Sequence, residues 1–382
     1  AASANVANGI AMSSNGTLAL ADGTGLASNY SLNSTVINIA QRVLNSSGSK
    51  TYDANTDALA GAITLSNLVS GEALNHSGTA TISSANAGSY TITNLSGISI
   101  ADGSGGTASN YTLTGGTHNF TVNRRAVSVS GTRLYDATTN AVASDLSTHA
   151  NLVGSETLNL SGTGTIASKN VGSNKTVSVG TLALADGSNG GLAANYTLSG
   201  GTHQLTVNQR PLNATLARQY DGTTTAAGSD LSSFDALQGG ETLTLSGSGT
   251  VGDENVANGQ GVTLGSLALV NGTGLASNYS LNSASLNITK RVLNSSGSKT
   301  YDANTDALAG AITLSNLVSG EALNHSGTAT ISSANAGSYT ITNLSGISIA
   351  DGSGGTASNY TLTGGTHNFT VNRRAVSVSG TR

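Results

Sequence analysis

Apolar and small polar residues alternate along much of the chain, and this alternation predicts short β-strands. The segment 74–82 alternates Leu, His, Gly, Ala and Ile with Asn, Ser and Thr, and similar series occupy 158–166 and 243–251. A period of two places alternate side chains on opposite faces of an extended chain, which is typical of a strand with one buried face. The glycines inside these series predict a bulge or a close contact within the sheet.

The same pattern predicts the other elements around segment 74–82. Further strands are expected at 43–51, 62–69, 89–93, 98–100, 111–113 and 120–122, and turns at 71–72 and 102–103. No segment keeps a period of 3.6 residues, and the best candidate for one helical turn is 230–238 (DLSSFDALQ). Six or seven short strands separated by Gly, Asn and Asp favour an all-β fold.

We therefore predict a tandem array of small antiparallel β-sandwich domains of the immunoglobulin-like kind. The alternative is a β-grasp-like, mostly-β repeat with one short helix. The last strand of each unit, for example FTVN at 120–123, runs almost directly into the first strand of the next. Linkers this short favour an elongated rod over loosely connected domains.

An internal repeat organises the chain. Residues 42–133 and 291–382 are identical, at an offset of 249 residues. Tyr-Asp pairs recur at spacings of 83, 85 and 81, and Asn-Tyr pairs recur with a similar period, so 249 residues contain three divergent units. The residues that mark the repeat are Tyr52, Asp53, Tyr111, Tyr135, Asp136, Tyr196, Tyr220, Asp221, Tyr279, Tyr301, Asp302 and Tyr360.

An arginine begins each unit and sets the expected boundaries. Complete units are expected at 42–124, 125–209, 210–290 and 291–373, the last identical to the first. Residues 1–41 match 250–290 with one residue inserted, which predicts the C-terminal part of a unit, and 374–382 predict the start of a further unit. We interpret the chain as part of a longer array.

Composition narrows the class of protein. The chain has no Cys, no Trp and only 9% charged residues, with a net charge of −4. The absence of Cys excludes disulfides and thiol chemistry. So few Lys and Arg residues argue against nucleic acid as a partner. No run of eighteen apolar residues exists, so no membrane span is expected in this segment.

The recurring polar residues are interpreted as structural. We expect each Tyr of the Tyr-Asp pairs to pack on the core of its repeat, while the Asp side chain closes a turn. Asp-Gly pairs at Asp22, Asp102, Asp186 and Asp351 have the outline of calcium loops. Calcium takes six or more oxygen ligands, and each loop offers one carboxylate, so a hairpin turn is the preferred explanation and no metal site is predicted.

Two further sets of residues, histidines and glutamates, are candidate sites. His118, His203 and His367 have no second ligand at metal spacing, which favours partly buried structural histidines. The equivalent turns of the four units carry Glu72, Glu156, Glu241 and Glu321. No carboxylate partner lies near these glutamates in sequence, and no G-x-S-x-G elbow is present. We therefore predict no catalytic residue, no cofactor and no enzyme activity.

The order of motifs resembles a known family. From Arg42 the chain reads R-x-L, TYD, SGE, SGT, NYTL and TVNRR, with a period of about 80 residues. This order resembles the YDG-type and related MBG-type repeats of large bacterial surface adhesins, including filamentous-haemagglutinin-like proteins of two-partner secretion. Tyr-Asp-Gly occurs only at 220–222, and the other copies read Tyr-Asp-Ala. The resemblance implies an extracellular, mostly-β stalk and carries over no ligand-binding residue.

Three functions follow as hypotheses. The first is a stalk or fibre segment of a secreted or cell-surface adhesin, which spaces a distal tip from the cell and supports cell–cell or biofilm-matrix adhesion. In the second, the repeats themselves bind extracellular polysaccharide or other cells through many weak sites. The third is lateral self-association into an extracellular filament.

Overall fold

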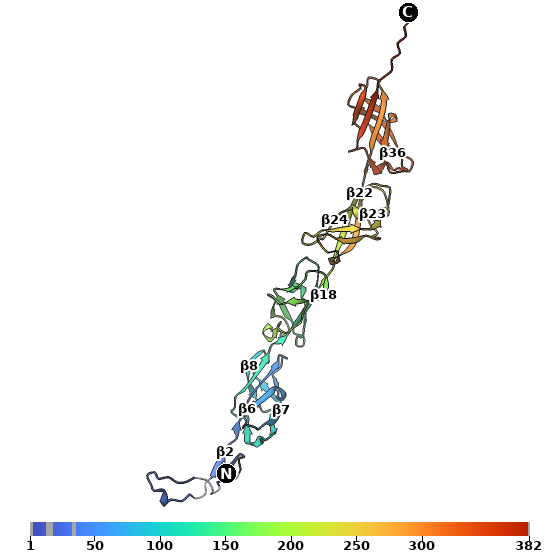
Figure 1. Cartoon of the computed structure of the whole chain (residues 1–382). Coiled ribbons are helices and arrows are strands. Elements are labelled where there is room, and N and C mark those ends of the chain that lie inside the picture. The colour runs from blue at the N-terminus through green and yellow to red at the C-terminus, as the bar shows by residue number, and fades with distance from the viewer. Residues whose placement is uncertain (1–2, 13–17, 33–35, 381–382) are drawn as a thin grey trace. The chain divides into compact units, whose positions relative to one another are not determined.

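The structure is a computed structural model that describes residues 3–12, 18–32 and 36–380 of the chain (Figure 1). Its contacts divide the chain into two compact bodies. The first body comprises Ala1–Arg133, Thr139–Ser168 and Asn174–Thr206, and the second comprises Leu134–Thr138, Lys169–Ser173 and Val207–Arg382. Repeat 42–124 thus belongs to the first body, and repeats 210–290 and 291–373 belong to the second.

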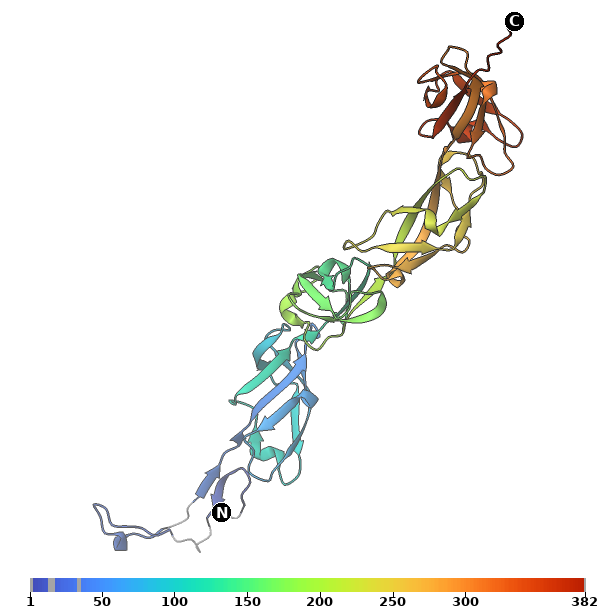
Figure 2. The same ribbon diagram turned by 45° about the horizontal axis from the view of Figure 1, so that its top comes forward.

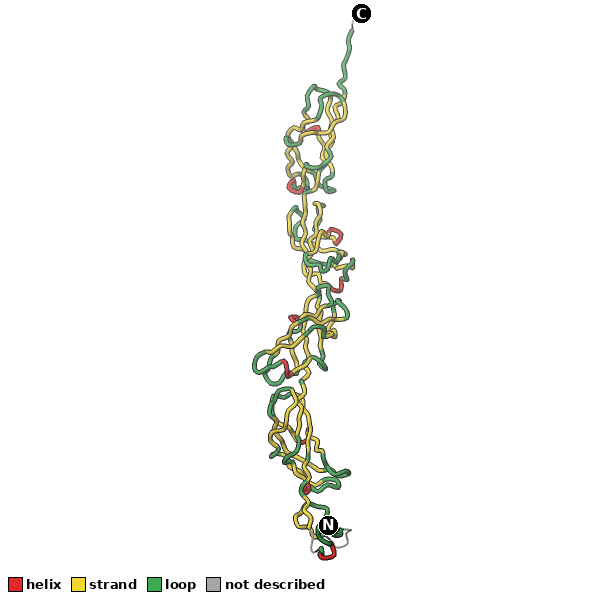
Figure 3. Tube along the Cα trace, turned by 90° about the vertical axis from the view of Figure 1, so that its left-hand side faces the viewer, coloured by secondary structure: helices red, strands yellow, loops and turns green. Residues whose placement is uncertain are grey.

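The described residues are almost entirely strands and loops, which confirms the all-β repeat array (Figure 3). Helices in this part of the chain are 3₁₀ turns of three residues each. None of them is long and apolar enough to span a membrane. Residues 1–41 contribute β1 (Ala7–Ala11), η1 (Ala27–Asn29) and β2 (Val36–Ile39), and β1 pairs with β2 antiparallel.

Repeat 42–124 shows the arrangement of strands in one unit. Its elements are β3 (Arg42–Val43), β4 (Asn45–Thr51), β5 (Asp57–Leu59), η2 (Ala60–Ala62), β6 (Ile63–Ser66), β7 (Leu74–Ile82), β8 (Gly88–Asn94), β9 (Ile98–Asp102), η3 (Ala108–Asn110), β10 (Tyr111–Thr112) and β11 (His118–Asn123). The sheet order is β5-β7-β8-β11-β4-β6, and β9 also pairs with β7. The strands expected from the alternation are therefore present, together with the short strand β5.

Repeat 125–209 builds the same pattern from a different sequence. Its elements are β12 (Arg125–Ala126), β13 (Ser128–Leu134), β14 (Asn140–Val142), η4 (Ala143–Asp145), β15 (Thr148–Ala150), β16 (Leu158–Ser161), β17 (Thr163–Ile166), β18 (Gly172–Ser178), β19 (Ala183–Asp186), η5 (Ala193–Asn195), β20 (Tyr196–Thr197) and β21 (His203–Asn208). The sheet order is β14-β17-β18-β21-β13-β15, with β16 paired to β19.

Repeat 210–290 carries the longest strands. Its elements are β22 (Arg210–Gln219), β23 (Thr225–Ala227), η6 (Gly228–Asp230), β24 (Leu231–Phe234), β25 (Leu243–Ser246), β26 (Ser248–Thr250), β27 (Ala257–Gly261), β28 (Ala268–Asn271), η7 (Ala276–Asn278) and β29 (Tyr279–Thr289). The helical turn expected at 230–238 is wrong. The 3₁₀ turn ends at Asp230, and 231–234 is a strand because it pairs antiparallel with β22.

Repeat 291–373 reproduces repeat 42–124 in the second body (Figure 2). Its elements are β30 (Arg291–Val292), β31 (Asn294–Thr300), β32 (Asp306–Leu308), η8 (Ala309–Ala311), β33 (Ile312–Ser315), β34 (Leu323–Ile331), β35 (Gly337–Asn343), β36 (Ile347–Asp351), η9 (Ala357–Asn359), β37 (Tyr360–Thr361) and β38 (His367–Asn372). The order β32-β34-β35-β38-β31-β33 matches that of its identical copy.

The sheets are mixed, and this refines the expected antiparallel arrangement. In repeats 42–124, 210–290 and 291–373 the first long strand pairs in parallel with the last, as β4 does with β11 through six residue pairs. Parallel neighbours need a long crossover between them, and here the rest of the repeat supplies it. The remaining pairs of repeat 42–124 other than the short β3–β10 pair are antiparallel.

The pairing partner of strand β7 changes at a glycine. In β7, residues 74–78 pair with β9, whereas residues 79–81 pair with β5. The change falls at Gly78 (φ +100°), where an added Cβ would lie 1.9 Å from the carbonyl oxygen of Gly97. In the next repeat Gly162 (φ +86°) separates β16 from β17 in the same way. The predicted close contact at these glycines is confirmed.

We expect Gly162→Ala to destabilise repeat 125–209 by about 1–3 kcal/mol, because it combines a left-handed backbone with overpacking. An added Cβ would lie 2.2 Å from the Thr181 carbonyl oxygen. Hydrogen exchange of peptides from this repeat, whose sequence is unique in the chain, measures the loss. Gly61→Ala is the control, since a Cβ at Gly61 meets no atom within 4 Å. Equal exchange in both variants would contradict the assigned role of Gly162.

Candidate functional site at the repeat junctions

The recurring tyrosines and glutamates meet where one repeat joins the next. In the first body, Tyr52 of repeat 42–124 donates a hydrogen bond to Glu156 Oε1 of repeat 125–209 at 2.7 Å. Tyr196 donates to Glu156 Oε2 at 2.6 Å. The two tyrosine rings lie edge to face with centroids 5.3 Å apart, a favourable geometry for aromatic pairs. We call this Tyr–Glu–Tyr group the junction node.

The second body contains two more junction nodes with the same geometry. Their bonds are Tyr135 to Glu241 Oε1 (2.7 Å), Tyr279 to Glu241 Oε2 (2.9 Å), Tyr220 to Glu321 Oε1 (2.7 Å) and Tyr360 to Glu321 Oε2 (2.6 Å). The ring centroids are 5.3 Å and 5.5 Å apart. The same Tyr–Glu–Tyr contact therefore joins three pairs of repeats that differ in sequence.

Local structure places each member of the node. Tyr52 follows β4 directly, and its backbone N–H donates to the carbonyl of Asn123 at the end of β11. The Asp53 carboxylate accepts the N–H of Asn55 at 3.2 Å and closes the turn beyond Tyr52, as expected for the Tyr-Asp pair. Glu156 lies in a tight turn in which its N–H donates to Val153. Tyr196 begins β20, directly after η5.

An asparagine forms two further hydrogen bonds across each junction. The Asn195 carbonyl oxygen accepts the N–H of Ala87 at 2.8 Å, and its amide donates to Asn86 Oδ1 at 3.0 Å. Asn195 is fully buried. The same two bonds are formed by Asn110 with 5–6, by Asn278 with 170–171 and by Asn359 with 255–256. In these four Asn-Tyr pairs the Asn thus binds the preceding unit through two hydrogen bonds.

Apolar packing continues through a junction. In the second body one core cluster contains Tyr220, Leu245 and Leu286 of repeat 210–290 together with Leu293 and Tyr360 of repeat 291–373. Tyr220 packs on a core, as expected for the Tyr of a Tyr-Asp pair, and this core extends into the next repeat. Its ring belongs to a core that two repeats share.

Burial and the carboxylate keep the tyrosines protonated. Burial first, and then the hydrogen bond to Glu156, raises the pKa of Tyr52 to about 12. The same causes raise the pKa of Tyr196 and Tyr360 to about 12, and that of Tyr220 further. Loss of a phenolic proton would place a second negative charge beside the carboxylate, which disfavours ionisation.

One node also contains a cation. Lys169 Nζ lies 2.7 Å from Glu241 Oε1 and 5.9 Å from the centre of the Tyr135 ring. Burial acts to raise the pKa of Glu241, but hydrogen bonds from Lys169, Tyr135 and Tyr279 together lower it. The hydrogen bond to Glu241 raises the pKa of Lys169. At this junction Lys169 therefore balances the negative charge of Glu241. The node at Glu156 differs, because the hydrogen-bond partners of Glu156 are two phenols.

Other candidate residues have structural roles. Asp102 Oδ1 accepts the N–H of Ala108 at 2.7 Å and so holds the start of η3, and Asp22, Asp186 and Asp351 make the same bond in their loops. Within residues 3–12, 18–32 and 36–380, no group of three or more His, Asp or Glu is placed to hold a metal ion.

The histidines are held by backbone and hydroxyl groups. His203 Nδ1 accepts the N–H of Val129, so its Nε2 carries the proton that it donates to the Leu198 carbonyl at 2.9 Å. His118 contacts Ser46 Oγ and the Leu113 carbonyl, and His367 repeats these contacts with Ser295 and Leu362. These bonds account for both ring nitrogens of each histidine.

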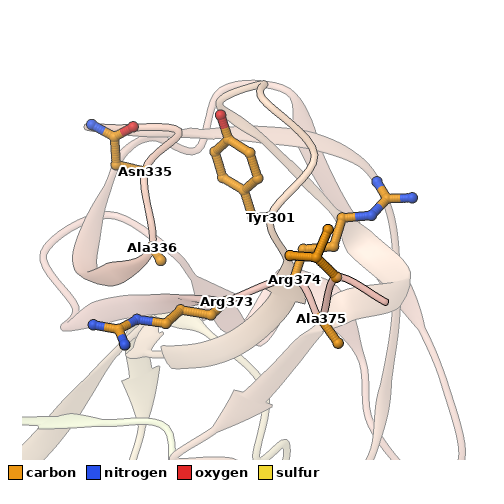
Figure 4. Close-up of a pocket in the computed structure, with 7 residues that line it drawn as sticks. Tyr301, Asn335, Ala336, Arg373, Arg374 and Ala375 are labelled. Carbon is orange, nitrogen blue, oxygen red and sulfur yellow. The ribbon is translucent and has the colours of Figure 1, made fainter. Parts of the chain in front are cut away.

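Within the described residues, two marker tyrosines, Tyr111 and Tyr301, are not part of a complete node. Tyr111 donates to Glu72 Oε2, and the described bonds of Glu72 include no tyrosine from residues 1–41. Tyr301 and Asp302 follow β31, and Asp302 closes the turn as Asp53 does. Tyr301 is 37% exposed, whereas Tyr52, its identical counterpart, is 3% exposed. Figure 4 shows Tyr301 with Asn335, Ala336, Arg373, Arg374 and Ala375 around a pocket, and the residues that line this pocket include no glutamate.

The fold and its junctions define a class of protein, a tandem all-β repeat array. Its family follows from comparison, because the model of the YDG domain matches residues 40–120, 118–206, 202–286 and 285–367. These matches cover most of the chain, which belongs to the YDG domain family.

Other comparisons add little to this assignment. No curated protein matches the chain. Among solved structures, the Bacillus anthracis TIE protein is similar over 83% of this chain at 8% identity, with a TM-score of 0.16. The chain spans 64% of that protein's length. A similarity at this level supports no inference about fold or function.

We expect Glu156→Ala to weaken the junction between repeats 42–124 and 125–209 by about 1–3 kcal/mol, because two buried hydroxyls lose their acceptor. Urea denaturation of the full chain measures the effect. Glu72→Ala is the matched control, since Glu72 accepts from one tyrosine among the described residues, and it is expected to cost less. A larger loss for Glu72→Ala would show that the second tyrosine bond contributes nothing.

Alkaline pH is expected to destabilise the junctions. A tyrosine with a pKa of about 12 in the folded chain and about 10 in the unfolded chain contributes stability that is complete below pH 10. This contribution is lost as the pH rises from 10 to 12, since only the unfolded chain releases the proton. Absorbance of tyrosinate at alkaline pH, recorded together with circular dichroism, measures both events. Titration of all tyrosines in one step near pH 10, with the fold intact, would contradict the prediction.

Proposed function

We propose that the chain is a structural stalk segment of a secreted or cell-surface bacterial adhesin, and that it spaces a distal binding region from the cell. The observation that carries this proposal is the junction node, which occurs at three successive junctions between unlike repeats. A spacer must keep consecutive repeats in a fixed relative orientation. A buried, hydrogen-bonded junction does so because it restrains motion between the two repeats that it joins.

The length of the linkers supports the same function. A single residue lies between β11 and β12, between β21 and β22, and between β29 and β30. Such connections leave little backbone to flex between units. Membership of the YDG domain family and the identical copies 42–124 and 291–373 agree with a modular array that changes length by whole units.

The chemistry of the node favours a structural role over catalysis. Its phenols have raised pKa values and are buried, so they supply neither a nucleophile nor a base near neutral pH. We propose that the protein is not an enzyme, that it acts outside the cell, and that it supports cell–cell or biofilm-matrix adhesion through the region it presents.

Lengthening the array tests the spacer function. A second copy of 42–290 inserted after Lys290 creates only junctions that the chain already contains. The particle is expected to lengthen by about 75–100 Å, which is three units of strand-limited length. The melting temperature is expected to stay unchanged, because contacts in such arrays are within units and between neighbours. Electron microscopy and calorimetry measure the two quantities.

Two outcomes would contradict the stalk. A particle that compacts instead of lengthening would show that units contact each other beyond nearest neighbours. Binding of the purified chain to polysaccharide or to cells, rising with the number of repeats, would show that the repeats themselves are the adhesive region.

A matched chain with Glu156→Ala, Glu241→Ala and Glu321→Ala is expected to give more bent particles, since all three nodes lose their acceptor.

A further inference from the structure

The residue that follows each Tyr-Asp pair has a left-handed backbone in all four complete repeats. Its φ is +61° at Ala54, +63° at Ala137, +71° at Gly222 and +66° at Ala303. This conformation favours glycine, yet three of the four positions carry alanine. Since all four backbones agree, the conformation of this residue does not decide between alanine and glycine. The neighbouring repeat supplies the difference.

Gly222 lies against the repeat that follows it. A Cβ added at Gly222 would lie 2.9 Å from Val318 Cγ1 and 3.5 Å from Glu321 Oε1. Packed carbon atoms lie about 3.5–4.0 Å apart, so a methyl group at this position would overlap Val318. Val318 packs against the core cluster that contains Tyr220 and Tyr360, and these neighbours restrict its movement.

The preceding junction has the opposite arrangement of sizes. Ala137 of repeat 125–209 carries the methyl group, and Gly239 of repeat 210–290 faces it. A Cβ added at Gly239 would lie 3.0 Å from the Ala137 Cβ. One methyl group therefore fits between these two residues, and two do not.

The turns that contact these residues differ in backbone shape. In each turn the N–H of the node glutamate donates to the carbonyl three residues earlier at 3.0 Å. Both central residues of the turn 238–241, Gly239 and Gly240, are left-handed, whereas only Gly320 is left-handed in the turn 318–321. These φ values are typical of different β-turn types. The two turns therefore present different residues to the preceding repeat, a glycine in one case and a valine in the other.

We propose that the residue after each Tyr-Asp pair and the turn of the following repeat form a size-matched contact, and that this contact determines which repeat can follow which. A repeat with the turn 318–321 fits after a repeat that carries glycine at this position, as Gly222 does. A repeat with Gly239 in its turn fits after a repeat that carries alanine there. Such specificity comes from an unfavourable contact with the wrong neighbour as well as from a favourable contact with the right one.

This contact limits how the array can change length, whatever the function of the array. Repeat 42–124 has the same turn as its identical copy, at 69–72. Placed directly after a copy of itself, its Val69 meets the methyl group of the preceding Ala54. Insertion of a whole 249-residue cassette keeps Gly222 before each such turn, whereas insertion of a single repeat does not.

Gly222→Ala in the full chain tests the contact. Hydrogen exchange of the peptide 219–227, whose sequence occurs once, is expected to become about tenfold faster, as for overpacking of a well-packed site. Adding Val318→Ala is expected to return the exchange to the rate of Val318→Ala alone. Alanine adopts this backbone conformation at Ala54 and Ala137, so backbone strain alone does not account for a large loss. Unchanged exchange in Gly222→Ala, or a loss that Val318→Ala does not restore, overturns the proposal.

Gly239→Ala and Gly154→Ala are a matched pair for the other junction. Both residues are left-handed, at φ +61° and +53°, but a Cβ added at Gly154 meets no described atom within 4 Å. Gly239→Ala is therefore expected to lower the midpoint of urea denaturation more than Gly154→Ala does. Ala137→Gly removes the facing methyl group and is expected to restore most of this difference. Equal losses in the two glycine variants, or no restoration, would leave backbone strain as the cause and overturn the proposal.

Insertion of a second copy of 42–124 after Arg124 tests the order of repeats. All natural residues are retained, and the inserted turn now follows Ala54. The melting temperature is expected to fall. Ala54→Gly in the preceding copy is expected to recover about 2–4 °C more than the same change gives in the natural chain, where this residue precedes repeat 125–209. A melting temperature that does not fall, or equal effects of Ala54→Gly in the two chains, overturns the proposal.

Discussion

One carboxylate that accepts hydrogen bonds from tyrosines of two consecutive repeats is the contact on which each described junction depends. Removing a carboxylate from water is costly unless its oxygens are satisfied, and here each oxygen of Glu156 accepts one phenol. The tyrosine of the Tyr-Asp pair is buried where the next repeat covers it, since Tyr52 is 3% exposed and its counterpart Tyr301 is 37% exposed. Burial of this tyrosine, its hydrogen bond to the glutamate and its contact with the second aromatic ring therefore occur together at a complete junction.

This dependence explains how a chain poor in aromatic residues builds an ordered array. Aromatic residues make up 4% of the sequence, and most tyrosines lie at junctions rather than at the centre of a unit. The core inside repeat 291–373 consists mainly of Ile, Ala and Val, with Phe369 as its one fully buried aromatic residue. The largest side chains are placed where two units share them, so each unit gains apolar burial from its neighbour.

Much of the fold could be predicted from the sequence, because strand alternation is local. The segments 74–82 and 118–123 form strands near the expected bounds, and Gly78 is the predicted close contact. The junction node could not be found this way, since Tyr52 and Glu156 are 104 residues apart. Even the tyrosine partner inside the same repeat is distant in sequence, because Tyr196 and Glu156 are 40 residues apart. The available signal was that Glu and Tyr recur with the same period.

Other features that the sequence pattern does not predict also depend on contacts between distant segments. The 3₁₀ turn that ends at Asp230, rather than a turn over 230–238, reflects pairing of 231–234 with β22, which local propensity does not encode. The parallel pairing of the first and last strands depends on topology, because alternation is the same in parallel and antiparallel pairs. The sequence around Asn195 predicts an ordinary loop residue. Its role depends on hydrogen bonds to residues 86–87, which lie in another repeat.

The parallel pairing of β4 and β11 has a mechanical consequence. The chain enters repeat 42–124 at the start of β4 and leaves it at the end of β11, and the two strands run side by side in the same direction. Tension applied through the neighbouring units therefore acts along the strands and in opposite senses on the two of them. The hydrogen bonds that join six residue pairs are loaded together in shear, rather than opened one after another from an end.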